Sequence, residues 1–160
     1  MLTKFWHWYE KNLILNTRIA SGLFIIQLIH LYWLTTDVVL LRLTGNTYFP
    51  ISSFWQNLLV IADYTEIPAL IATSILYINS LRKKRSLKPI LFLILLNSQW
   101  LHIFWITDEF VVNGFNGTVD LHLPVWLAWV AIGIDYLELP VIFDTIKLSL
   151  KNIFKSNRVL

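Results

Sequence analysis

The sequence predicts an all-α protein, a four-helix transmembrane bundle made of two tandem two-helix repeats. Three observations predict it: four long apolar segments, a 72-residue offset at which polar residues coincide, and a one-sided distribution of lysine and arginine. Of the 160 residues, 56% are hydrophobic and only 14% are charged, whereas about 25% of the residues of a typical soluble domain are charged. This composition indicates a single integral membrane domain over residues 1–160.

Each apolar segment is long enough to cross a bilayer as a helix, which takes ~20 apolar residues for about 30 Å of hydrocarbon. The predicted spans are residues 19–41, 54–78, 90–112 and 125–146. Pro68 and Pro140 lie inside the second and the fourth span. Because each proline removes a backbone hydrogen bond, we expect these two helices to kink or open locally.

Polar residues recur at an offset of 72 residues inside these apolar segments. The matched pairs of the first and third spans are Gln27 and Gln99, His30 and His102, Trp33 and Trp105, Thr35 and Thr107, and Asp37 and Glu109. Those of the second and fourth spans are Asp63 and Asp135, Tyr64 and Tyr136, Glu66 and Glu138, and Pro68 and Pro140. Matching polar residues, in segments where they are costly, predict two copies of one unit, repeat 1 at about 16–80 and repeat 2 at about 88–152.

Lysine and arginine cluster on one side of the predicted membrane. They precede the first span, crowd the connection between the second and third spans and follow the last, whereas the other two connections hold only Arg42. The positive-inside rule then places both termini in the cytoplasm. The expected localisation is a multi-pass integral membrane protein, of the endoplasmic reticulum in a eukaryote or the inner membrane in a bacterium. The net charge of +3 reflects this topology and some attraction to anionic lipid, and it does not indicate nucleic-acid binding.

The polar residues of each helix share one face. At about 100° per residue, Gln27, His30 and Asp37 fall within an arc of ~120°, and Asp63 and Glu66 are neighbours because they are three residues apart. An ionised side chain at mid-membrane costs about 2.5–3.5 kcal/mol. We therefore expect these groups to point inward and to pair with one another.

The two repeats have the same orientation, so a pseudo-two-fold axis should run along the membrane normal. Helix geometry places one histidine and one glutamate of each repeat near mid-membrane. The expected ring around the axis consists of His30, Glu66, His102 and Glu138. No cysteine is present, which excludes thiolate metal sites and cysteine nucleophiles.

Several functions fit such a ring. One is a cavity for an apolar ligand, because carboxylates and tryptophan faces attract a ligand cation or a developing carbocation. Another is a dinuclear metal site: two histidines and four carboxylates match the inventory of di-iron carboxylate bundles, although the usual Glu-x-x-His spacing is missing. A third is haem b between His30 and His102. The remaining alternative is a hydrogen-bonded network that only holds the helices together.

Four stretches of the chain carry a likeness to a known family. They are Ile29-His30-Leu31 running to Asp37, Glu66-Ile67-Pro68-Ala69, Pro89-Ile90-Leu91-Phe92 through Gln99 to Thr107-Asp108-Glu109, and His122 with Pro124-Val125-Trp126 running to Leu139-Pro140 and Asp144-Thr145-Ile146-Lys147. Over about residues 20–150 the chain thus resembles the EXPERA-domain family, which includes a sterol isomerase (emopamil-binding protein) and the sigma-2 receptor.

The resemblance implies a helical bundle with cytoplasmic termini and an intramembrane pocket for sterols and amphiphilic amines. In the isomerase branch it implies a proton shift through a carbocation held by acidic residues and a tryptophan. This chain has Leu34, Tyr136 and Gly133 where the isomerase has glutamate, tryptophan and asparagine. These departures argue against sterol isomerisation and place the chain nearer the sigma-2 branch.

The expected function is binding of a sterol-like or other lipid-like molecule without a cofactor, with isomerase-type proton transfer if the protein is an enzyme. The candidate catalytic residues are Glu66 and Glu138 as acids, His30 and His102 as bases, and Asp63 and Asp135 as orienting groups. The candidate ligand-binding residues are Gln27, Gln99, Trp33, Trp105, Thr35, Thr107, Asp37, Glu109, Tyr64 and Tyr136.

The alternative function is a metal-dependent or haem-binding membrane redox protein. It would use two transition-metal ions or haem b, and the metal ligands would be the six candidate catalytic residues. The expected partners are a lipid-like or sterol-like molecule and the membrane itself, without nucleic acid, and a homodimer is left open.

Overall fold

The computed structural model describes residues 1–46, 48, 53–107 and 125–156, and it contains helices and no strand among these residues. In chain order the elements are α1 (Leu2–Lys11), α2 (Leu13–Trp33), the π-helical segment η1 (Leu34–Val39), α3 (Leu40–Thr44), α4 (Ser53–Tyr64), α5 (Glu66–Lys83), α6 (Leu87–Asn97), α7 (Gln99–Ile106), α9 (Val125–Tyr136) and α10 (Leu139–Ser156). The predicted all-helical class is confirmed for the described residues.

Three helical stretches are long and apolar enough to span a membrane, namely Leu13–Thr44, Ile61–Lys83 and Leu87–Phe104. They overlap the first three predicted spans. The fourth predicted span is divided between α9 and α10. Large apolar side chains such as Phe104 face outward, with 77% of its surface exposed, whereas Asp135 is only 3% exposed. A surrounding of hydrocarbon favours this inverted distribution, because it solvates apolar side chains and not charged ones.

Two prolines set the breaks between α4 and α5 and between α9 and α10. Pro68 lies in the first turn of α5, and Pro140 in the first turn of α10. A proline ring clashes with the carbonyl four residues earlier and offers that carbonyl no amide hydrogen. The preceding helices end at those two residues, Tyr64 and Tyr136. The amide of the residue after each tyrosine donates instead to the carbonyls three and four residues back.

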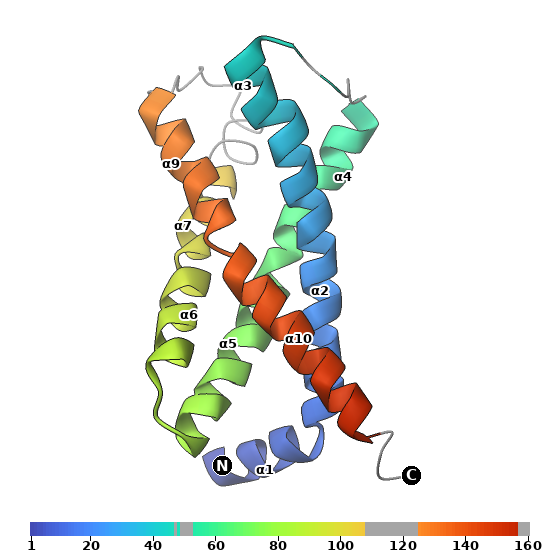
Figure 1. The fold of residues 1–160 in the computed structure, drawn as a ribbon, viewed down its shortest axis with the longest axis vertical. Helices are drawn as coiled ribbons and strands as arrows, with labels where there is room; N and C mark the ends of the chain where they lie inside the picture. The colour runs from blue at the N-terminus through green and yellow to red at the C-terminus, as the bar shows by residue number, and fades with distance from the viewer. Residues whose placement is uncertain (47, 49–52, 108–124, 157–160) are drawn as a thin grey trace.

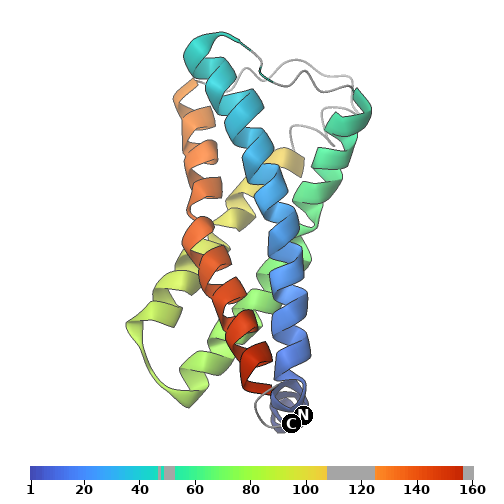
Figure 2. The ribbon, with the colours of Figure 1, turned by 45° about the vertical axis from the view of Figure 1, so that its right-hand side comes forward.

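The helices of the bundle run along the long axis of the molecule, while α1 lies across one end (Figure 1). Helix α2 packs against both α5 and α10, and the second view shows α2 and α10 side by side over much of their length (Figure 2). The first residue of the chain and the end of α10 lie at the end that holds α1. We call this end the α1 end and the opposite one, which carries α3, the α3 end.

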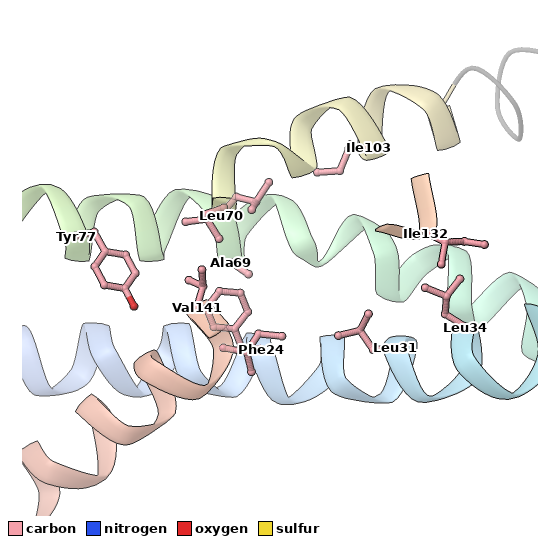
Figure 3. Packing of buried hydrophobic residues seen from close by; sticks show 11 residues of the cluster. Phe24, Leu31, Leu34, Ala69, Leu70, Tyr77, Ile103, Ile132 and Val141 are labelled. Carbon is pink, nitrogen blue, oxygen red and sulfur yellow. The ribbon is translucent and has the colours of Figure 1, made fainter. Parts of the chain in front are cut away.

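The apolar core fills the space where α2, α5 and α10 meet. Phe24, Leu70 and Val141 are fully buried there and approach one another from the three helices (Figure 3). Leu31 of α2 and Ile132 of α9 extend the cluster toward the α3 end. The core therefore fixes the spacing of the helices that carry the polar residues described next.

Two irregularities interrupt the helices that carry the histidines. Helix α2 continues into the π-helical η1, and α6 is separated from α7 at Ser98. The sequence analysis predicts neither feature. A single π-helical turn is often found at a functional site, because it redirects the side chains that follow.

Candidate functional site

Two histidine–aspartate pairs meet inside the bundle. Nδ1 of His30 on α2 pairs with Oδ1 of Asp63 on α4. Nδ1 of His102 on α7 pairs with Oδ1 of Asp135 on α9 at 3.0 Å. The centroids of the two imidazole rings are 6.4 Å apart. Each carboxylate thus contacts one ring nitrogen of its histidine. The orienting role of both aspartates stays a prediction.

Two buried glutamates lie beside these pairs. Glu66 opens α5 and is 4% exposed, and Glu138, just before α10, is 3% exposed. The charge of Glu66 interacts with those of Glu138, Asp135 and Asp63. We call the whole group the polar centre; it consists of His30, His102, Asp63, Asp135, Glu66 and Glu138. The sequence analysis predicts that these side chains face inward, and the burial of the four carboxylates and of His30 confirms it.

Three members of the polar centre are close enough to share a ligand. One potential ligand atom from each of His30, His102 and Asp135 lies within 4.8 Å of the other two. In the described part of the chain, Oδ2 of Asp135 and Oε1 of Glu138 are buried without a hydrogen-bond partner. Buried polar atoms almost always have a partner. Among the described atoms of the polar centre, these two oxygens have neither a hydrogen bond nor an ion pair, so a cation, a proton or a donor would complete them.

Two glutamines support the backbone at the helix breaks. Nε2 of Gln27 donates to the carbonyl of Ala62 at 3.0 Å, and Nε2 of Gln99 donates to the carbonyl of Ile134 at 2.7 Å. Both carbonyls lie in the last turn before a break. The glutamines thus stabilise the turns that carry the aspartates, and they do not belong to the polar centre itself.

Two tyrosine–threonine pairs connect the two sequence units on the α3 side of the polar centre. The hydroxyl of Tyr136 contacts Thr35 Oγ1 at 2.6 Å, and that of Tyr64 contacts Thr107 Oγ1 at 3.0 Å. Each threonine hydroxyl already donates to the carbonyl four residues back, at 2.8 Å in both cases. The tyrosines are therefore the donors, and each unit supplies one tyrosine and one threonine to the other.

The remaining predicted site residues are less closely tied to the centre. The ring of Trp33 is half-buried, with its centroid 5.8 Å from that of His30. Asp37 lies about two turns after His30, in η1. Its Oδ2 is buried without a hydrogen-bond partner among the described residues. Glu109 and the side chain of Trp105 lie outside the part of the chain that can be described.

A second polar group lies nearer the α1 end, and the sequence pattern did not predict it. Tyr77 and Thr145 are buried there, Asp144 is half-buried and Lys88 is exposed. The hydroxyl of Tyr77 donates to Asp144 Oδ2 at 3.0 Å, and Nζ of Lys88 contacts Oδ1 of the same carboxylate at 2.5 Å. Tyr77 also contacts Thr145 Oγ1 at 3.3 Å. The signal that could have found the group is Asp144, an acid inside the fourth apolar span. Its lysine lies 56 residues away, so no local spacing shows the pairing.

The polar centre offers imidazole nitrogens and carboxylate oxygens, which together bind divalent transition metals, and no thiolate. The same four carboxylates can also hold protons, because ionised carboxylates so close together repel one another. No protein-family model, curated protein or solved structure matches this chain, so the geometry of these side chains is what bears on its function.

Proposed function

We propose that the polar centre is an intramembrane site for two divalent transition-metal ions, in a metal-dependent membrane protein. The observation that carries the proposal is the approach of His30, His102 and Asp135 to within 4.8 Å of one another in ligand atoms. Iron or manganese there would supply redox chemistry. The three ligands come from three helices, α2, α7 and α9, so an ion would also hold the bundle together.

Charge balance supports two ions. The polar centre contains four carboxylates, which are costly to bury as anions. Two divalent cations carry four positive charges, so they would neutralise the four carboxylates while both histidines stay neutral and bind as ligands. The oxygens of Asp135 and Glu138 that have no partner in the described chain would supply coordination sites.

Asp63 fits an outer role in such a site. Metal-binding histidines usually donate their second ring nitrogen to a carboxylate, which fixes the ring, and Nδ1 of His30 is held in this way by Asp63. The same geometry disfavours haem. A carboxylate oxygen within 4.8 Å of ligand nitrogens on both histidines would lie where the porphyrin ring surrounds the iron.

The proposal includes the topology predicted from the sequence, a four-helix bundle of two tandem repeats with cytoplasmic termini. In its support, three kinds of contact recur at the 72-residue offset: the His–Asp pair, the Gln–carbonyl bond and the Tyr–Thr pair. The helix break before proline recurs at the same offset. The interrupted α9 and α10 would form the fourth crossing, as α4 and α5 form the second.

Binding of a sterol-like or other lipid-like molecule, which the resemblance to EXPERA-domain proteins implies, is the second candidate. One observation favours it: half-buried aromatic side chains, among them Trp33 and Tyr136, lie beside the polar centre. In that function Glu66 and Glu138 would be the acids of a proton shift, and no metal would be needed.

Metal analysis of purified protein separates the two candidates. We expect about two transition-metal ions per chain in the wild type, as in dinuclear carboxylate bundles, and fewer than one in the Glu66→Gln, Glu138→Gln double variant. Asp144→Asn is the matched control, because it removes the carboxylate that contacts Tyr77 and Lys88, outside the polar centre. This variant should keep the full metal content. A metal-free wild type that retains a stoichiometric lipid after purification would favour the second candidate and reject the first.

A further inference from the structure

Helix α1 has two faces of opposite character. One face docks on the bundle: Tyr9 is 4% exposed, and burial raises the pKa of its hydroxyl to about 12. Leu2 and Phe5 lie on the same face as Tyr9, seven and four residues before it, and they remain exposed. Trp8, at the border of this face, is exposed as well, and Lys4 and Lys11 lie on the opposite face. Helix α1 lies across the end of the bundle (Figure 1). Its exposed apolar side chains therefore lie at this end of the molecule.

The docking of α1 is specific. The guanidinium of Arg82, near the end of α5, lies 4.1 Å from the centroid of the Trp6 ring. Nζ of Lys83 lies 3.5 Å from Oε1 of Glu10. Two independent contacts thus fix α1 against the end of α5, and they bring α1 close to the basic residues that follow α5.

This place has an excess of positive charge. Glu10 is the acid of α1, and it is already paired with Lys83. The basic side chains there that are exposed and form no ion pair among the described residues are Lys4, Lys11, Arg18, Lys84 and Arg85. The group of five is called the basic edge below.

We propose that α1 is an interfacial helix and that the basic edge binds the headgroups of anionic phospholipids on the membrane surface at the α1 end. An amphipathic helix with aromatic and aliphatic residues on one face and lysines on the other lies in the plane of the interface. Leu2, Phe5 and Trp8 enter the acyl boundary, and the basic edge meets the phosphates. Each lysine or arginine near an anionic surface strengthens its binding by about fivefold. This inference does not depend on a metal at the polar centre.

Spin-labelled phosphatidylglycerol and phosphatidylcholine, compared on protein reconstituted in phosphatidylcholine vesicles, test the proposal. We expect the wild type to hold the anionic lipid at least about tenfold more strongly, and the preference to weaken at high salt because the contacts are exposed. The variant Lys4→Gln, Lys11→Gln, Lys84→Gln, Arg85→Gln should lose most of it. These side chains are exposed and unpaired in the described chain, so the fold should survive, which circular dichroism checks.

A single-residue pair provides the matched control. Arg85→Gln and Arg42→Gln each remove one exposed arginine, the first beside α1 and the second in α3 at the opposite end. Only Arg85→Gln should lower the preference, by about fivefold. Equal preference for the two lipids in the wild type, or an unchanged preference in the quadruple variant, would overturn the proposal.

Discussion

Residues 27–66 and 99–138 share the glutamine, the histidine–aspartate pair and the glutamate described above, and their described residues make the same kinds of contact. Their glutamines, however, are not equally well satisfied. Gln27 donates to two acceptors, the carbonyl of Ala62 at 3.0 Å and Thr65 Oγ1 at 3.1 Å. Among the described residues Gln99 donates to the carbonyl of Ile134 alone, since Leu137, at the position equivalent to Thr65, has no hydroxyl to accept a second bond.

The carboxylates of the second unit, like its glutamine, have fewer partners among the described residues. Oδ1 of Asp63 forms an ion pair with Nδ1 of His30. Asp135 pairs with His102 through Oδ1 only, and its Oδ2 is among the buried oxygens without a partner in the described chain, together with Oε1 of Glu138. Asp37 of the first unit also has a buried oxygen without a partner, but within the polar centre the carboxylate oxygens that lack both a hydrogen bond and an ion pair among the described residues belong to the second unit. A ligand that supplies positive charge would complete the second unit, and this is why we assign the ion-binding role to Asp135.

The largest effect should therefore come from Asp135→Asn. This change neutralises a proposed metal ligand. We expect the metal affinity to fall by more than about 100-fold, which is a larger loss than changes to outer-shell residues cause. The equivalent change in the first unit, Asp63→Asn, should cost about 10–100-fold, because it only disturbs the orientation of His30. Both are measured by metal titration of the purified protein.

The pair of variants is its own control, since each replaces one aspartate by asparagine at equivalent positions. Equal losses would mean that the two aspartates have equal roles, and the asymmetry would then have no functional consequence. A larger loss from Asp63→Asn would reverse the assignment.

A smaller effect is expected from exchanging the two positions that distinguish the glutamines. Leu137→Thr should give Gln99 the second acceptor that Gln27 has, and Thr65→Leu should remove it from Gln27. Side-chain hydrogen bonds in membrane proteins contribute about 0.6 kcal/mol on average. We expect the free energy of unfolding to rise by about this amount in the first variant and to fall by it in the second. Reversible denaturation in detergent measures both; a loss of stability in Leu137→Thr would show that the site cannot take the hydroxyl.

The inward-facing polar residues could be predicted from the sequence for an energetic reason. An ionisable group such as Glu66 or Asp135 is too costly to expose to hydrocarbon, and the 72-residue offset shows which groups belong together. The helix ends at Tyr64 and Tyr136 follow from local chemistry too, because a proline sits four residues later in each case. These features depend on single residues or on short spacings.

Other features depend on tertiary packing and could not be predicted in this way. The hydroxyl pairs formed by Tyr64 and Tyr136 cross between the two units, so each joins residues that the offset alone does not match. The bond between Lys88 and Asp144 connects different helices, and the π-helical turn around Asp37 has no spacing signal. The free oxygens of Asp135 and Glu138 could not be predicted either, because Asp63 and Glu66 have the same residue identities and only the tertiary contacts differ.

X-ray absorption spectroscopy of the wild-type protein after loading with iron or manganese tests the central claim most directly. The account predicts a first shell of nitrogen and oxygen only, imidazole scattering from two histidines, and a second metal at about 3.5–4 Å, as in two-metal sites. A loaded protein without imidazole scattering, or one that retains no metal after removal of the excess, would contradict it.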